Sequence, residues 1–260
     1  MKRYLAKRDP VMADLMRAAG PYRLRVESTH SPFEALARAI THQQLNGVAA
    51  NRILARFIAL CGDGAFPAPA AVIACPDTEL RAVGLSFAKI ASLKDLATKA
   101  ECGIVPDGRT LEVLDNEVIV ERLTQVRGIG RWTVEMLLMF RLGRPDVLPV
   151  DDFGVRNGFR LAYGLRGLPT PRALAQFGER WAPHRTAAAW YLWRAVDLAR
   201  EGRLPPPIER PRGLRVVKPK QKSLRKAAAG RARKRSAAGA GPRRAPSTRA
   251  ARSRRGRSKR

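Results

Sequence analysis

Cysteine is scarce in this 260-residue chain, which contains only Cys61, Cys75 and Cys102. An odd number at wide spacing excludes a disulfide framework and a cysteine metal cluster. It indicates a reducing compartment, the cytoplasm of a bacterium or the nucleus of a eukaryote. No apolar run is long enough to cross a bilayer, and the N-terminus lacks the apolar segment of a signal peptide. We therefore expect no membrane partner.

Acidic residues are absent from the last fifty positions. Residues 211–260 hold 20 of the 50 Lys and Arg, none of the 22 Asp and Glu, and no Phe, Tyr or Trp. Such a segment has too little apolar surface to offset the entropy of ordering. We predict that 209–260 is a disordered basic tail that binds DNA phosphates, with a solubilising, RNA-binding or partner-docking segment as alternatives. The remaining chain carries a net charge of only +8.

Strand signals are also rare, and helix signals occur almost throughout residues 1–208. Pro follows a capping residue at Asp9-Pro10 and at Ser31-Pro32, and Gly20 marks a helix end. We predict an all-α fold. The expected helices span 10–20, 32–42, 46–60, 77–83, 86–103, 116–123, 131–142, 153–163, 171–181 and 184–200.

The stretch 123–132 predicts a tight turn between two helices. Gly128 and Gly130 interrupt the helical pattern on either side of Ile129, and an apolar helix follows from Arg131. A Gly-X-Gly turn at a helix start presents unpaired N–H groups and the positive end of the helix dipole, which suit a phosphate. An ordinary helix corner without a ligand is the alternative.

Four segments together resemble the helix-hairpin-helix DNA glycosylases, specifically the AlkA-type 3-methyladenine glycosylases. Besides the turn, they are the Gln-Gln helix pair at 31–50, the Leu-Pro-Val-Asp-Asp-Phe loop at 148–153, and the two helices within 179–193. The resemblance covers about residues 10–205 and implies the shorter, all-helical form. It implies two helical lobes with an active-site cleft between them, about 31–142 for the central lobe and 1–30 with 143–208 for the second. It also implies a monomer, without a cofactor, that is nucleoid-associated in a bacterium.

The resemblance implies that Asp152 is the catalytic acid and that Asp151 is a helix cap. A carboxylate beside the sugar stabilises the oxocarbenium-like transition state that forms when the glycosidic bond breaks. Local sequence alone favours the alternative that both acids merely cap the helix that begins at Phe153.

Tryptophan occupies position 132, where bifunctional relatives carry a lysine nucleophile. The resemblance therefore implies hydrolysis by water, and the lack of cysteine after Cys102 excludes the iron–sulfur loop of some relatives. We expect a substrate pocket for a flipped, positively charged alkylated purine. The expected pocket residues are Trp132, Met136, Tyr191 and Trp193, whereas Trp181 and Trp190 are expected in the core.

Several residues are expected to contact double-stranded DNA. Gln44 best matches the family's wedge residue, with Leu45 next, although Gln43 and Gln44 equally fit capping of a helix corner. Phosphate contacts are expected from Arg127, Gly128, Ile129, Gly130 and Arg131. The resemblance also implies a monovalent cation on the backbone carbonyls of Thr124, Val126 and Ile129.

Two other classes of function remain open at this point. A non-catalytic, architectural DNA-binding protein would use the hairpin and the tail but need neither Asp152 nor an aromatic pocket. A glycosylase for a different damaged base would share the fold and differ in pocket shape. Asp152→Asn separates the first class from an enzyme, because only an enzyme loses its function.

Overall fold

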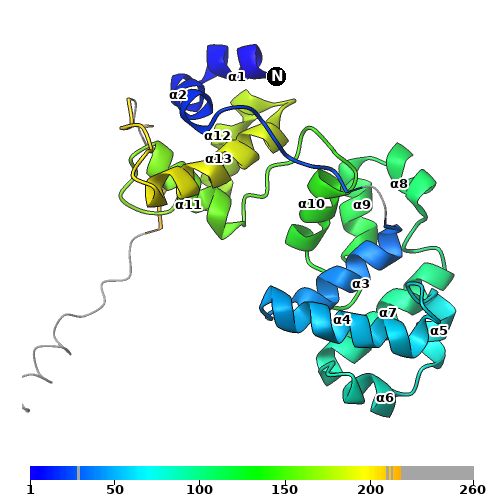
Figure 1. The fold of residues 1–260 in the computed structure, drawn as a ribbon. Coiled ribbons are helices and arrows are strands. Elements are labelled where there is room, and N and C mark those ends of the chain that lie inside the picture. The colour runs from blue at the N-terminus through cyan, green and yellow to red at the C-terminus, as the bar shows by residue number, and fades with distance from the viewer. Residues whose placement is uncertain (28–29, 209–210, 212, 218–260) are drawn as a thin grey trace, which may run out of the picture. The chain divides into compact units, whose positions relative to one another are not determined.

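The computed structural model describes residues 1–27, 30–208, 211 and 213–217, which are helical as predicted and contain no strand beyond one isolated bridge. No helix in these ranges is long and apolar enough to cross a membrane. The helices are α1 (Lys2–Arg8), α2 (Pro10–Ala19), α3 (Pro32–His42), α4 (Gly47–Cys61), α5 (Pro69–Ala74), α6 (Asp77–Ala82), α7 (Phe87–Glu101), α8 (Gly108–Val113), α9 (Asn116–Leu123), α10 (Arg131–Phe140), α11 (Phe153–Ala162), α12 (Pro171–Gly178) and α13 (Arg185–Arg200), with a 3₁₀ turn at Glu179–Trp181 (Figure 1).

Side-chain caps explain where most of the long helices begin. Asp9 accepts the N–H of Met12 at the start of α2, and Ser31 accepts the N–H of Glu34 at the start of α3, both at 3.1 Å. Asn46 and Ser86 do the same for α4 and α7. Each cap satisfies a backbone donor that a helix start leaves unpaired.

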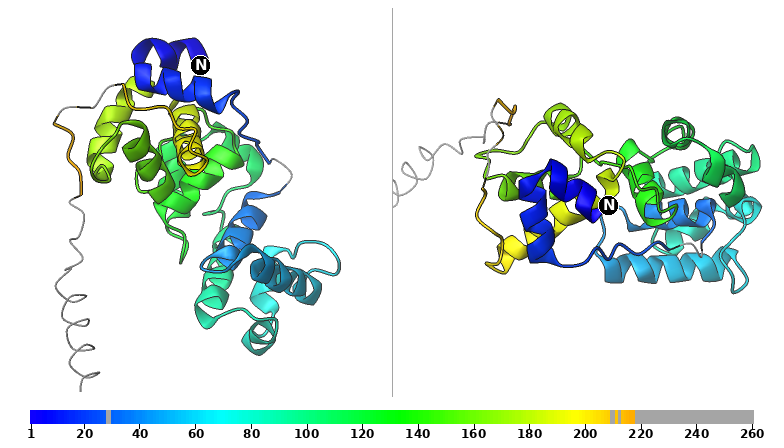
Figure 2. Two further views of the ribbon diagram at one scale, coloured as in Figure 1. Left: turned by 60° about the vertical axis from the view of Figure 1, so that its left-hand side comes forward. Right: turned by 90° about the horizontal axis from the view of Figure 1, so that it is seen from above.

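The helices pack in two groups. In the first, α3, α4, α5, α6 and α7 contact one another, and α10 packs on α3 and α9. In the second, α13 packs on α11 and α2, and α1 packs on α2 and the 3₁₀ turn. Both ends of the described chain therefore build one group, with the blue N-terminal helices beside the yellow C-terminal ones in each view (Figure 2).

The second group is centred on a buried carboxylate. Asp9 is 2% exposed and accepts hydrogen bonds from the Tyr163 hydroxyl at 2.6 Å and the Trp181 indole at 2.8 Å. Burying a charge requires such donors. Trp181 is fully buried as expected, and Trp190 is half-buried against Tyr22.

The boundary of the predicted tail needs a correction. Residues 213–217 run along the segment before α12, where Thr170 N–H donates to Arg215 at 3.0 Å and Val217 N–H donates to Leu168 at 2.7 Å. Leu214 packs against the core, which explains why this short apolar stretch is ordered. The compact, described part of the chain therefore extends to Val217, and the rest of the predicted tail lies outside the described residues.

Candidate active site

The predicted turn is a helical hairpin formed by α9 and α10. Gly128 has a φ of +79°, and a Cβ there would lie 2.7 Å from the Ser92 hydroxyl oxygen on α7. Ile129 is 4% exposed and fills the core beneath the turn. Gly130 caps α10 without any side-chain hydrogen bond, so the first N–H groups of α10 are left for an external acceptor.

Helix α7 holds the hairpin backbone in place. Asp95 accepts the N–H of Arg127 at 2.7 Å, and Lys99 bonds both Asp95 and the Gln125 carbonyl, the latter at 2.6 Å. Burial alone would raise the pKa of Asp95, but these two donors outweigh it and lower that pKa below its ordinary value. The turn is therefore braced before any ligand binds.

The loop between α3 and α4 contacts the hairpin directly. Gln43 donates from Nε2 to the Gly128 carbonyl at 3.0 Å, so the structure gives it a bracing contact within the protein. Gln44 is exposed and has a φ of +59°, a strained conformation for a residue with a side chain. Leu45 is 41% exposed beside it. Gln44 and Leu45 are therefore exposed next to the residue that contacts the hairpin, and the wedge role stays a prediction.

The two hairpin arginines differ in their ion pairs. The Arg127 guanidinium is exposed and forms no ion pair within the described part of the chain. Arg131 is held by Glu117 through two hydrogen bonds of 2.6 and 3.0 Å and by Glu135 at 3.2 Å. These two acidic partners would compete with a phosphate for the Arg131 charge, and the phosphate contact of Arg131 stays a prediction.

The predicted cation site involves three carbonyls of the same turn. The Val126 carbonyl accepts the N–H of Ile129 at 3.0 Å. No donor from the described residues reaches the Thr124 or Ile129 carbonyl. Two of the three oxygens thus fit a cation ligand, and a bound cation stays a prediction.

Asp152 begins α11 and is held by donors from three elements. Its Oδ1 accepts the N–H of Val155 at 2.7 Å and the indole Nε1–H of Trp193 at 2.8 Å. Its Oδ2 accepts the indole Nε1–H of Trp132 at 2.9 Å. The helix cap is therefore Asp152 itself, whereas Asp151, the expected cap, is exposed. Capping and a catalytic role are compatible, because the cap uses only one of the two oxygens.

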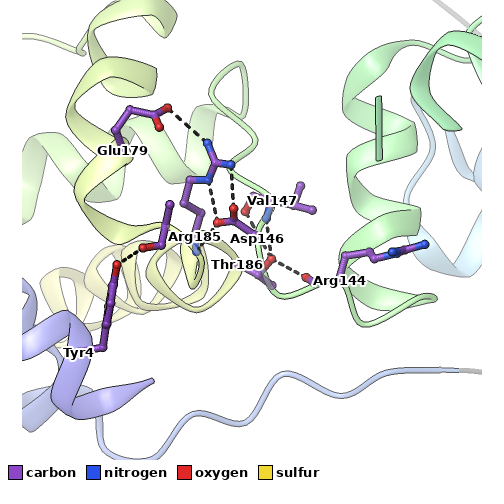
Figure 3. A network of polar contacts seen from close by, with 8 residues as sticks. Tyr4, Arg144, Asp146, Val147, Glu179, Arg185 and Thr186 are labelled. Atoms are coloured by element: carbon purple, nitrogen blue, oxygen red, sulfur yellow. Dashed lines mark hydrogen bonds and ion pairs between the residues drawn. The ribbon is translucent and has the colours of Figure 1, made fainter. Parts of the chain in front are cut away.

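The loop that carries Asp152 is anchored on α13. Arg185 grips Asp146 through two hydrogen bonds of 2.8 Å, and Thr186 accepts the N–H of Val147 at 3.0 Å and donates to the Arg144 carbonyl (Figure 3). Burial alone would raise the pKa of Asp146, but the Arg185 contacts lower it below its ordinary value. These contacts fix the route of the chain from α10 to the acid.

A cavity of about 610 Å³ lies beside Trp132. Its apolar wall includes Leu36 and Ala39 from α3 and Met136 and Phe140 from α10, and Gln43 and Gln44 also line it. Trp132 is 48% exposed there. Asp152 does not line the cavity, but its Oδ2 accepts a hydrogen bond from the indole of Trp132, which does.

Of the four predicted pocket residues, two line the cavity and two do not. Trp132 and Met136 line the cavity. Trp193 does not line the cavity, but its ring stacks on that of the lining residue Phe140 with ring centres 5.8 Å apart. Tyr191 is a core residue, which corrects the prediction: it is fully buried and its hydroxyl donates to the Gly20 carbonyl at 3.1 Å.

Comparisons with known proteins identify this arrangement. Residues 37–184 match the model of the HhH-GPD superfamily of base excision DNA repair proteins. The chain belongs to this superfamily. It is 45% identical over 186 residues to DNA-3-methyladenine glycosylase 1 of Schizosaccharomyces pombe, covering 71% of this chain and 82% of that protein.

Solved structures of superfamily members share the fold. The S. pombe 3-methyladenine DNA glycosylase in complex with abasic DNA matches with a TM-score of 0.67 and 43% identity, over 76% of this chain and 97% of that one. A DNA-3-methyladenine glycosidase from Bacillus halodurans matches with a TM-score of 0.69 and 34% identity, over 76% and 90%.

Some residues of this HhH-GPD site were missed from the sequence. Phe140 follows Trp132 and Met136 at a spacing of four, which places all three on one helix face, so its signal was present. Gly154 lies under the Trp193 indole: a Cβ there would be 2.8 Å from Trp193 Cδ1 and 3.0 Å from Asp152 Oδ1. That close approach is not readable from sequence spacing.

Proposed function

We propose that this chain is a monofunctional DNA glycosylase that excises alkylated purines, of the 3-methyladenine and 7-methylguanine type, from duplex DNA. The observation that carries the proposal is the placement of Asp152. Its carboxylate accepts hydrogen bonds from two indole N–H groups, one of them on Trp132, which lines the apolar cavity, and it lies on the chain segment that follows the helical hairpin.

The chemistry requires the damaged nucleotide to leave the helix. The anomeric carbon is inaccessible in stacked DNA, so the nucleotide rotates into a pocket. As the glycosidic bond breaks, positive charge develops on the sugar, and Asp152 stabilises that charge more than it stabilises the neutral ground state. The same carboxylate orients the attacking water, which leaves an abasic site and the free base.

The aromatic pocket supports a cationic base as the substrate. Alkylation at N3 or N7 places a positive charge on the purine, and an indole face attracts such a cation by about 1–2 kcal/mol when water is excluded. Trp132 offers an exposed ring at the cavity. The names of the S. pombe and B. halodurans relatives support the same substrate class.

The side chain at position 132 supports hydrolysis without strand cleavage. Covalent catalysis at the sugar needs an amine nucleophile, and an indole nitrogen is not one. We expect products with intact strands until alkali is added.

We further propose that the hairpin contacts the DNA, that the basic tail adds phosphate contacts, and that the enzyme acts as a monomer. A tail that binds phosphates steepens the salt dependence of DNA affinity. Replacing the Lys and Arg of 243–260 with Gln in the full-length chain should make the slope of log affinity against log salt shallower. An unchanged slope contradicts the tail proposal, and a dimer in sedimentation equilibrium contradicts the monomer. The reducing compartment stays a prediction.

The test of the enzymatic proposal is release of methylated bases from alkylated duplex DNA. The wild-type chain should release 7-methylguanine and 3-methyladenine without strand breaks. Asp152→Asn should slow release by at least about 100-fold, since it removes the charge that stabilises the transition state.

Asp151→Asn is the matched control, because it changes the neighbouring, exposed acid and should alter release by less than about threefold. Equal release by wild type and Asp152→Asn would remove Asp152 from the mechanism. DNA binding without base release from any alkylated substrate would favour the architectural alternative.

A further inference from the structure

Trp132 and Trp193 hold the two oxygens of Asp152 in different ways. Oδ1 has two donors, the Val155 N–H and the Trp193 indole. Oδ2 has the Trp132 indole as its sole donor from the described residues. Losing Trp132 would therefore leave one oxygen of the carboxylate without any hydrogen bond from the protein.

The Trp132 bond is not explained by the stability of the fold. Trp181 makes a similar indole–carboxylate bond to Asp9, but both partners are buried, and without that bond the indole would be an unsatisfied donor in the core. The ring of Trp132 is 48% exposed, so water could satisfy its N–H. The bond therefore acts on the carboxylate of Asp152 rather than on the stability of the fold.

An indole N–H can only donate, which determines what it does for Asp152. It cannot accept a hydrogen bond, so its polar contact with Asp152 is donation to Oδ2. It also fixes the rotation of the carboxylate, and a charge held in place before reaction needs no reorganisation as the sugar becomes cationic. The bond runs from α10, which begins at the hairpin, to the acid at the start of α11.

We propose that Trp132 is a positioning residue for Asp152, acting through its indole N–H in addition to any stacking on the base. The proposal rests on the proposed function of Asp152 as the catalytic acid. It assigns one hydrogen bond across two helices to orientation of the carboxylate, and it predicts that the shape of the ring at position 132 is not sufficient for full activity.

The decisive variant replaces only the indole N–H of Trp132. Incorporation of β-(3-benzothienyl)alanine at position 132 of the full-length chain replaces the indole N–H with sulfur and keeps the two-ring shape. Single-turnover release of 7-methylguanine should slow by about 10- to 100-fold, the range expected for one hydrogen bond to a charged group. Affinity for abasic-site duplex DNA should stay within about twofold, because stacking and the DNA contacts are retained.

The same replacement at Trp193 is the matched control. Its effect should be smaller, because Oδ1 keeps the Val155 N–H. Trp132→Phe, measured with a thermal melt to confirm folding, provides a second variant that lacks the N–H.

Coupling to Asp152 separates positioning from a purely structural role. Combined with Asp152→Asn, the replacement at position 132 should cause no further loss, because its target charge is already gone. Wild-type release with benzothienylalanine, or an equal additional loss in the Asp152→Asn background, overturns the proposal. If the wild-type chain itself releases no base, the proposed function fails first and the positioning role fails with it.

Discussion

Glu135 gives this fold a pH-dependent stability whose size follows from its burial. It lies on α10, one helical turn from Arg131, and its side chain is 7% exposed. Burial raises its pKa from the ordinary 4.5 to about 7, against the opposing charge of Arg131 and with help from the negative charges of Asp151 and Glu117.

The sign follows from linkage. Because the pKa is raised in the folded state, the folded chain binds more protons than the unfolded chain between about pH 4.5 and 7, so stability falls as pH rises through that window. Compared with a side chain that stays neutral, Glu135 lowers the free energy of unfolding by about 3 kcal/mol at pH 8 and by about 1 kcal/mol at pH 5.5. Glu135→Gln, which stays neutral, should therefore be more stable than wild type, with an advantage that grows by about 2 kcal/mol between these pH values.

The assay is thermal and urea unfolding of both proteins at pH 5.5 and pH 8. For a unit of this size, 2 kcal/mol corresponds to roughly 4–8 °C in Tm. Glu117→Gln is the matched control, because it removes the other acidic partner of Arg131 but is 68% exposed, so its effect should be small and nearly independent of pH. A Glu135→Gln difference that is the same at both pH values would refute the reasoning.

Two glycine substitutions test the geometry of the site. Gly154→Ala should displace the Trp193 indole and lower single-turnover base release by at least about tenfold, with little change in thermal melting, because its Cβ would lie 2.8 Å from the ring. Gly128→Ala should destabilise the fold by about 1–3 kcal/mol in urea titrations and weaken duplex binding measured by anisotropy, because its φ is +79°. Wild-type release in the first variant, or wild-type stability in the second, would contradict these assignments.

The helices that could be predicted from the sequence are those with strong local signals. Ser31-Pro32 and Asp9-Pro10 mark helix starts in any context, because capping and proline geometry are local. The short helices α1, α5 and α8 were not predicted, although α6, which has only six residues, was. Six or seven residues carry little periodicity, so such a helix is found from the sequence only where the flanking residues mark its ends.

In the site, too, helix spacing could be read from the sequence, whereas contacts between residues far apart in the chain could not. Tyr191 and Trp193 are two residues apart on one helix, so their side chains point about 200° apart and cannot share a wall. This spacing identifies one of them as core, although not which one. The contacts of Arg131 with Glu117 and of Gln43 with Gly128 join residues 14 and 85 positions apart, and no local pattern contains them.

Position 132 shows how one residue type can serve two requirements of hydrolysis at once. A lysine in the same place would carry an amine able to attack the sugar and would pair with Asp152 as a salt bridge, which draws charge away from the developing cation. The indole keeps a donor 2.9 Å from Oδ2 and adds neither a charge nor a nucleophile. In the proposed mechanism, Asp152 therefore keeps its charge for the developing cation on the sugar, and water is left as the attacking group. That donor belongs to α10, which starts at the hairpin, so under the proposed function we expect the position of the hairpin on DNA to influence the orientation of the carboxylate.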